Sequence, residues 1–265
     1  MIGYYYRRGR GDDAFAVFES TPDTRSNWDP NIQHGSPPLA LMTKLVEDAT
    51  AGSGQRIGRL AMDILGPVPV APLWARTWVE RPGTRIALHA AELLAQRPDG
   101  GRRPVARLHA WLLATSDTAD VAGDRHPPLT EGAAVPVDHG WLGAPGYLET
   151  VDWRAQRSEP GADAVSWLTP RSAVVEGAEP TPLQRLAAVV DSANGIGAVL
   201  DPRRFVFMNT DTVVHLHRLP RGTDFAVRAR ASIGPDGIGV TTAEVYDRDG
   251  CVGSSAQTLL VQRMG

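Results

Sequence analysis

The feature that most constrains the fold of this chain is an internal repeat. A proline-started helical segment, a glycine-marked end and a run of β-type segments occur over residues 34–114 and again over residues 181–261. Ala91-Glu92-Leu93 and Ala243-Glu244-Val245 lie 152 positions apart, and the offset drifts by a few residues elsewhere, as loop insertions would produce. This repeat is too long for a solenoid unit. It predicts two half-domains that complete one another's hydrophobic core.

The composition indicates an ordinary globular protein. The chain has 265 residues, of which 42% are hydrophobic and 22% charged, enough for one large or two small domains with a sizeable core. The net charge is −3, so the chain as a whole lacks the excess of positive charge that is typical of nucleic-acid-binding proteins. The single cysteine, Cys251, excludes an intramolecular disulfide and a multi-cysteine metal site. No run approaches the ~18 apolar residues of a membrane span, and the first residues lack an apolar signal core, so we expect a cytoplasmic protein.

Local patterns place one helix and a set of strands in each half. Ser36 is expected to cap a helix over residues 39–49, and Thr181 to cap a second helix that Asn194-Gly195 would close. The expected strands are rich in β-branched and aromatic residues and are bounded by tight turns. They span about 15–20, 59–66, 73–81, 84–96 and 105–114, and then 147–154, 164–168, 205–218, 224–233, 238–246 and 252–261. Antiparallel strands laid against one helix make each half α+β, and the two sheets could pair edge to edge.

Residues 115–146 interrupt this pattern. The segment holds four prolines and five glycines and has no clean periodicity, which is unusual for a loop inside a compact domain. We therefore expect a crossover linker between an N-terminal half, residues 1–114, and a C-terminal half, residues 147–265. Two such halves in one chain mimic a dimer, so a monomer and a homodimer are both reasonable.

Two polar residues in the second half are candidates for chemistry. Asp191 falls in the last turn of the second helix, where a carboxylate opposes the helix dipole and needs a partner or an exposed position. Gln257 lies in the middle of the last strand, and the repeat offset matches it with Ala110 in the first half. The amide of Gln257 in one copy and the methyl group of Ala110 in the other are consistent with one half that keeps a functional site and one half that has lost it.

Alternation along the long strand expected at residues 205–218 places Asn209 and Thr210 on opposite faces. His215 and His217 could be metal ligands, but no further cluster of histidines or acids has suitable spacing, so we expect no metal. No phosphate-binding loop and no G-x-S-x-G nucleophile elbow is present.

Four segments together resemble the acyl-CoA thioesterases with a double hotdog fold, and the resemblance covers nearly the whole chain apart from the crossover. These segments are Gln33-His34-Gly35-Ser36-Pro37-Pro38, residues 190–195, residues 209–218 and residues 246–261. The resemblance implies hydrolysis of a fatty acyl-CoA thioester without a metal, a cofactor or a covalent intermediate. It also implies three site residues that hold and activate water: an aspartate on the second helix, a hydroxyl residue early in the next strand and a glutamine in the last strand.

By motif alignment the aspartate falls on Asp191 and the glutamine on Gln257. The hydroxyl position falls on Asn209, which departs from the family pattern, with Thr210 as its neighbour; an asparagine amide can also orient water. His34, Gly35 and Ser36 open the first helix. They are candidates for substrate binding, because backbone N–H groups at a helix N-terminus suit a developing oxyanion or the CoA moiety.

Two other functions remain open from the residues alone. A non-catalytic hotdog protein that binds acyl-CoA is possible, because Asn209 replaces a hydroxyl residue. A hotdog hydratase or dehydratase would need an Asp and His pair near a helix start; His34 is there, but no aspartate has the matching spacing.

Overall fold

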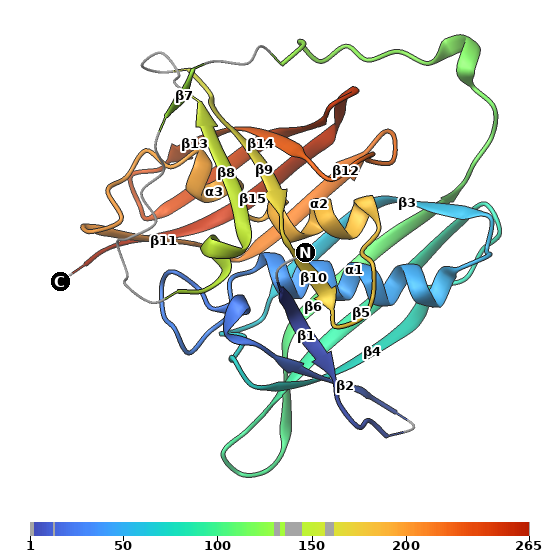
Figure 1. Ribbon diagram of the computed structural model, residues 1–265, viewed down its shortest axis with the longest axis vertical. Coiled ribbons are helices and arrows are strands. Elements are labelled where there is room, and N and C mark those ends of the chain that lie inside the picture. Colours follow the sequence, from blue (N-terminus) through green and yellow to red (C-terminus); the bar gives the residue numbers. More distant parts are fainter. Residues whose placement is uncertain (1–2, 13, 130–132, 136–144, 157–161, 265) are drawn as a thin grey trace.

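A single sheet wraps around two helices that lie side by side in the middle of the molecule (Figure 1). The computed structural model describes all residues except 1–2, 13, 130–132, 136–144, 157–161 and 265. The helices are α1 (Ser36–Thr50) and α2 (Pro182–Val190), one from each half of the chain. This is the α+β double hotdog arrangement expected from the sequence. No helix in the described part of the chain is both long and apolar enough to cross a membrane.

Each half supplies its own strands to the sheet. The first half contains β1 (Gly3–Arg8), β2 (Ala16–Ser20), β3 (Gln55–Ile64), β4 (Pro72–Arg81), β5 (Ile86–Gln96) and β6 (Arg102–Ala114). The second contains β8 (Val151–Gln156), β9 (Ala164–Pro170), β10 (Ser172–Val175), β11 (Phe205–Asn209), β12 (Asp211–Leu216), β13 (Phe225–Ile233), β14 (Ile238–Asp247) and β15 (Gly250–Arg263). The described crossover residues include β7 (Ala134–Val135), and short helical turns lie at Pro22–Thr24, Ala119–Val121, Tyr147–Thr150 and α3 (Ala193–Ile196). The strand order is β10-β1-β2-β4-β5-β6-β3-β12-β15-β14-β13-β9-β8-β7, and β11 also pairs with β15.

The pairing of the strands repeats between the two halves of the chain. Ala91 on β5 pairs with Leu108 on β6, and Ala243 on β14 pairs with Ser255 on β15, so both partners recur at offsets of 152 and 147 residues. The halves meet where β3 and β12 pair antiparallel, with Ala61 opposite Val213. These two residues are also 152 positions apart, so the seam lies on the pseudo-two-fold axis that relates the halves. Edge-to-edge pairing, as predicted, leaves neither strand unpaired at this position.

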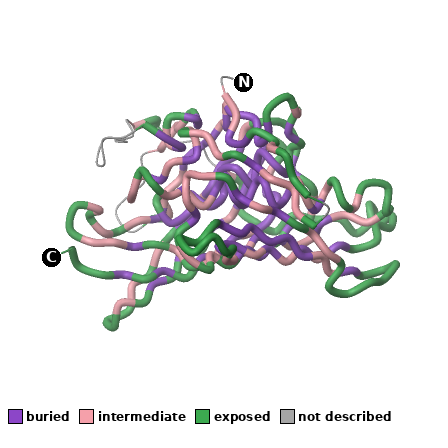
Figure 2. The backbone as a smooth tube through the Cα atoms, turned by 90° about the horizontal axis from the view of Figure 1, so that it is seen from below, coloured by how far each residue is buried: buried purple, intermediate pink, exposed green. Residues whose placement is uncertain are grey.

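The two halves share one hydrophobic core. Buried residues concentrate in the middle of the molecule, and exposed residues gather at the outlying loops and hairpin ends (Figure 2). Leu39, Met42 and Val46 lie on one face of α1 and are fully buried in the same cluster as Leu186 and Val190 of α2. Burial of a side chain of this size contributes about 1.5–3 kcal/mol. This shared core holds the ends of α1 and α2 in a fixed relation to the sheet.

Several local expectations differ from the structure. Gly35, not Ser36, is the N-cap of α1, because two prolines follow Ser36 and its hydroxyl bonds to no described group. The Thr181 cap is confirmed, since its hydroxyl oxygen accepts the backbone N–H of Gln184 at 3.1 Å. Asn194 does not close the helix region but lies inside α3. Residues 147–150 form a short helical turn instead of a strand, and β1 was not anticipated.

The long strand expected at residues 205–218 is two strands. Asn209 on β11 pairs with Leu259, whereas Val213 on β12 pairs with Ala256. Between these two pairs the chain advances by four residues on β11 and β12 but by only three on β15. The extra residue makes a bulge at Thr210 and reverses the alternation beyond it. Asn209 and the residues of β12 that point toward the core therefore share a side, contrary to the unbroken alternation predicted from the sequence.

Arg218, in one of the four segments that carry the family resemblance, links the chain just after β12 to the β14–β15 turn. Its guanidinium donates to both carboxylate oxygens of Asp247 at 2.6 Å and to the carbonyl of Cys251 at 3.0 Å. Asp247 also accepts the backbone N–H groups of Arg221 and Asp249. One buried carboxylate thus orders three chain segments next to the seam.

Candidate active site

Asp191 lies at the centre of a hydrogen-bond cluster between the two helices and the sheet. It is the C-cap of α2 and only 2% exposed. One carboxylate oxygen, Oδ1, accepts from the hydroxyl of Thr212 at 2.5 Å, the amide of Asn209 at 2.8 Å and the amide of Gln257 at 3.2 Å. The structure thus brings together three predicted site residues that are far apart in the sequence, Asp191, Asn209 and Gln257.

Thr212 is the site residue that sequence reasoning missed. Its hydroxyl is fully buried beside Asp191, and the strand break at Thr210 places it on the same side as Asn209. Thr210, the hydroxyl proposed from its position, is exposed and contacts Asp211 and the carbonyl of Thr258 instead. The site therefore has a hydroxyl although the motif position carries an asparagine. Only the bulge, which the sequence does not signal, would have revealed this.

The second carboxylate oxygen of Asp191 lies against the start of α1. A Cβ atom added at Gly35 would be 2.4 Å from Oδ2, so only glycine lets the backbone come this close. The N-terminus of α1 carries positive partial charge, which offsets the unfavourable position of Asp191 at the C-terminus of α2. The N–H of Gly35 has no acceptor among the described residues, and Pro37 and Pro38 have no N–H group.

His34 forms the wall beside this oxygen. Its Nδ1 accepts the backbone N–H of Ser36 at 3.1 Å and lies 3.6 Å from Asp191 Oδ2. Burial lowers the pKa of His34, while Asp191 acts in the opposite direction, so the imidazole is neutral at neutral pH with its proton on Nε2. The ring stacks on Tyr147 at 4.0 Å, and the Tyr147 hydroxyl donates to the carbonyl of Ala188 on α2. The Tyr147 turn therefore fixes His34 to the helix that carries Asp191.

Gln257 closes the cluster from β15. Its amide nitrogen also contacts the Asp191 carbonyl at 2.9 Å and Thr212 Oγ1 at 3.1 Å. Its carbonyl oxygen is buried and accepts no hydrogen bond from the described residues. The amide nitrogen of Gln257 thus serves Asp191 and Thr212, and its carbonyl oxygen remains as an acceptor.

The equivalent position in the first half lacks these groups. The register matches Gln257 with Ala110 and Thr212 with Leu60, both buried apolar residues. Glu47, near the end of α1, accepts hydrogen bonds from Thr181 and Gln184 at the start of α2. The acid is thus present in both copies, but the amide and the hydroxyl are present in one.

Two cavities flank the cluster. The larger, about 380 Å³, has aromatic walls that include Trp28, Trp153 and Phe207. The smaller, about 230 Å³, is lined by Asp191, Asn209 and Gly35 together with apolar residues. His34 and Trp28 line both cavities. The smaller cavity thus reaches Asp191 itself, and the larger one lies beside it, beyond His34 and Trp28.

Family models match both halves of the chain. The acyl-CoA thioesterase N-terminal domain matches residues 24–113, and the acyl-CoA thioesterase C-terminal domain matches residues 124–261. The chain belongs to the acyl-CoA thioesterase family. No curated protein sequence matches it. Within the family, the half boundaries at residues 114 and 147 stay a prediction.

Solved structures share the fold over almost the full length. A candidate thioesterase II from Thermobifida fusca YX matches with a TM-score of 0.71 and 18% identity, covering 97% of this chain and 95% of that one. A protein of unknown function with a hot dog fold from Alicyclobacillus acidocaldarius matches with a TM-score of 0.68 and 16% identity, at the same coverage. The acyl-CoA thioesterase II TesB2 from Mycobacterium marinum matches with a TM-score of 0.65 and 14% identity, again covering 97% and 95%. At these identities the matches establish the double hotdog fold.

Proposed function

We propose that this protein hydrolyses acyl-CoA thioesters to a free fatty acid and CoA, with Asp191 as the general base. The proposal rests on the different surroundings of the two Asp191 carboxylate oxygens. Asn209, Thr212 and Gln257 hold Oδ1, while Oδ2 lies against Gly35 in the cavity wall. A carboxylate fixed in this way can take a proton from a water molecule without moving.

In this mechanism a water molecule bound at Asp191 attacks the thioester carbonyl carbon. Asp191 accepts the water proton in the transition state, an effect worth about 10²–10⁴-fold in rate. The carbonyl oxygen of Gln257, which has no described donor, accepts the second hydrogen of the water and orients its lone pair. The proton then passes from Asp191 to the departing CoA sulfur, and the carboxylic acid loses its remaining proton to solvent and leaves as a carboxylate.

The start of α1 would stabilise the oxyanion. The N–H of Gly35 is the one backbone donor at this helix start that is neither bonded within the described residues nor removed by proline. The neutral His34 supplies an Nε2–H donor in the wall of both cavities. Donors fixed before the reaction stabilise developing charge without reorganisation.

The larger cavity would hold the acyl group. Trp28, Trp153 and Phe207 give it an apolar surface, and it meets the smaller cavity at His34. An acyl chain in the larger cavity and the pantetheine arm in the smaller one would place the thioester carbonyl beside Asp191. The apolar walls favour an acyl group without charge along its length.

The test measures release of CoA from medium- and long-chain acyl-CoA with a thiol reagent. The wild-type protein should turn over at least one of these substrates, and Asp191→Asn should lower kcat by about 10²–10⁴-fold. Glu47→Gln is the matched control, because Glu47 is the corresponding acid of the first half and lies outside the cluster. Full activity of Asp191→Asn would refute the base assignment. Tight binding of acyl-CoA by the wild-type protein without release of CoA would indicate a binding protein instead.

A further inference from the structure

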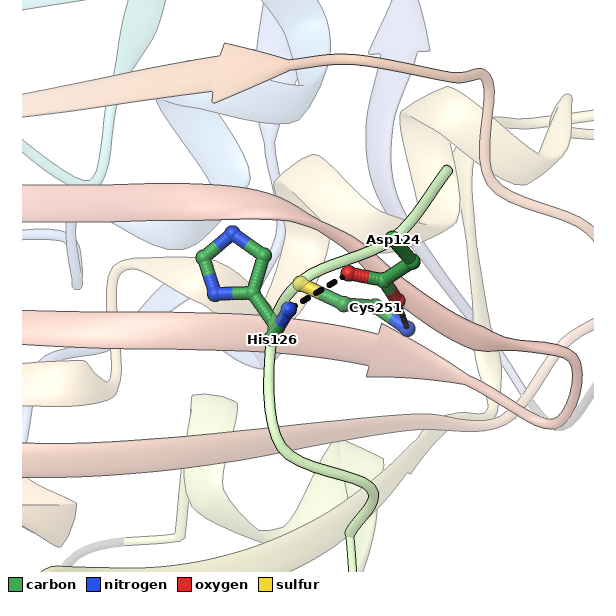
Figure 3. Close-up of side chains that lie close together, drawn as sticks. All are labelled: Asp124, His126 and Cys251. Atoms are coloured by element: carbon green, nitrogen blue, oxygen red, sulfur yellow. Dashed lines mark hydrogen bonds between the residues drawn. The ribbon is translucent and has the colours of Figure 1, made fainter. Parts of the chain in front are cut away.

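The crossover brings three metal-ligating side chains together on the outer face of the second half. Asp124 and His126 come from the crossover, and Cys251 lies at the start of β15 (Figure 3). One ligand atom from each residue lies within 4.8 Å of the others. In the part of the chain that the structure describes, this is the one group of three such residues with this spacing.

The crossover is held in this place by several contacts. Asp124 accepts the backbone N–H of Cys251 at 3.3 Å and that of His126 at 2.8 Å. The carbonyl of Pro127 accepts the hydroxyl of Tyr246 at 3.1 Å, and Leu129 packs on the small cluster that contains Cys251. The crossover therefore covers a sheet face that would otherwise meet solvent, and it buries the thiol.

A second imidazole lies at the edge of this cluster. His217 follows β12, and its backbone N–H donates to the carbonyl of Val252, the residue after Cys251. Its ring is parallel to that of His126 with the centroids 6.3 Å apart. Neither His215 nor His217, the pair considered from the sequence, belongs to the group of three, whose ligand atoms come instead from the crossover and β15.

A catalytic Cys-His-Asp arrangement does not explain the cluster. Asp124 bonds backbone N–H groups and not the His126 ring, so it does not orient the imidazole toward the sulfur. Burial raises the pKa of the Cys251 thiol to about 11, so the free thiol stays protonated at neutral pH. A protonated thiol is a poor nucleophile, but a bound metal ion can displace its proton.

We propose that Asp124, His126 and Cys251 bind a Zn²⁺ ion that clamps the crossover to β15. Thiolate, imidazole and carboxylate are the ligands that zinc uses in proteins. Zinc bonds of about 2.0–2.3 Å need ligand atoms about 3–4 Å apart. Asp124 and His126 are exposed, so rotation of the His126 side chain and a small shift of Asp124 Oδ2, whose contact with the Cys251 N–H is long at 3.3 Å, close the difference while Cys251 stays in place.

The charges around the cluster are compatible with a divalent cation. Asp124 and the Cys251 thiolate together balance two positive charges, and the thiol proton leaves to solvent. The nearby Arg218 guanidinium is already paired with both oxygens of Asp247. Arg56 donates to the His217 carbonyl.

The test uses tag-free, full-length protein treated with a chelator and then titrated with Co²⁺. Binding should give one ion per chain, intense visible bands of four-coordinate cobalt and a thiolate-to-cobalt charge-transfer band, all removed when Zn²⁺ is added. Cys251→Ser should abolish the charge-transfer band. Removal of a residue that only orients a metal ligand costs about 10- to 100-fold in metal affinity. His126→Ala and Asp124→Asn remove ligands themselves, at exposed positions, so each should weaken Zn²⁺ binding by more than this.

His109→Ala is the matched control, because His109 lies on β6 in the other half, outside the cluster. This variant should bind Zn²⁺ with the affinity of the wild type. Absence of the charge-transfer band in the wild-type protein at saturating Co²⁺ would overturn the proposal. So would unchanged Zn²⁺ affinity in both His126→Ala and Asp124→Asn, because the thiol would then bind metal without the crossover. These measurements do not depend on thioesterase activity.

Discussion

The closest backbone approach at the candidate active site predicts that Gly35→Ala will damage catalysis through Asp191. The new methyl carbon would lie 2.4, 2.8 and 2.9 Å from the three carboxyl atoms of Asp191, whereas ordinary contact begins at 3.4 Å. The carboxylate or the start of α1 must therefore move by about 1 Å, and a displacement of this size can cost about 10²-fold in rate. Overpacking should also lower the free energy of unfolding by about 1–3 kcal/mol.

The carboxylate is poorly placed to retreat, because Asn209, Thr212 and Gln257 hold its other oxygen. We therefore expect kcat to fall by about 10²-fold with a much smaller change in KM. The assay is steady-state release of CoA, with urea unfolding to show that the variant is folded. Gly123→Ala is the control, since nothing lies within 4 Å of its added Cβ atom.

A double-mutant cycle tests whether Gly35→Ala acts through Asp191. If it does, the substitution should cost much less in an Asp191→Asn background, where the base is already lost and only a shift of the Gly35 N–H donor remains to affect the rate. Equal fold losses in both backgrounds would refute this reasoning and show that the methyl group acts through that donor alone. Full activity of Gly35→Ala alone would show that the contact is not part of the catalytic geometry.

Further predictions concern the hydroxyl and a buried carboxylate. Thr212→Val should lower kcat by about 10- to 100-fold through loss of a hydrogen bond to a charged group, whereas Thr210→Val should have little effect on kcat; the reverse order would contradict the strand break. Arg218 and the N–H groups of Arg221 and Asp249 outweigh burial and hold the pKa of Asp247 below its usual value. Its stabilising contribution is therefore present above the unfolded pKa of about 3.9 and is lost as pH falls through the lower folded pKa. Asp247→Asn should lower the free energy of unfolding at pH 7 by about 3 kcal/mol, with a smaller difference near pH 3; a pH-independent difference in urea unfolding would contradict this.

Much of the architecture could be predicted because the two halves repeat the same physical pattern. The local signals predicted the helices and turns correctly because tertiary contacts do not override them here. These signals are apolar residues at helical spacing, Thr181 at a helix start and glycine turns between strands. The repeat offset then matched Gln257 with Ala110, and the strand register agrees with that match. A duplicated fold repeats its long-range pairing as well as its local structure.

The remaining features depend on non-local contacts. The bulge at Thr210 arises where β11 and β12 pair with β15 in different registers, and alternation alone cannot show which residue is extra. Thr212 was therefore missed, and Thr210 was placed at the site. Serine is a residue type favoured at N-caps, but the prolines after Ser36 have no N–H groups for its hydroxyl to accept, and Gly35 is the N-cap. The meeting of Asp124 and Cys251 depends on the path of a crossover that has no periodicity.

The first strand of the chain has a consequence for its connectivity. β1 pairs in parallel with β10 of the second half, while β3 pairs with β12, so the halves are joined by backbone hydrogen bonds at two separate places. The covalent link through the exposed residues 115–118 is then one connection among several. Two co-expressed fragments divided there would keep both sets of backbone hydrogen bonds and assemble into the same fold.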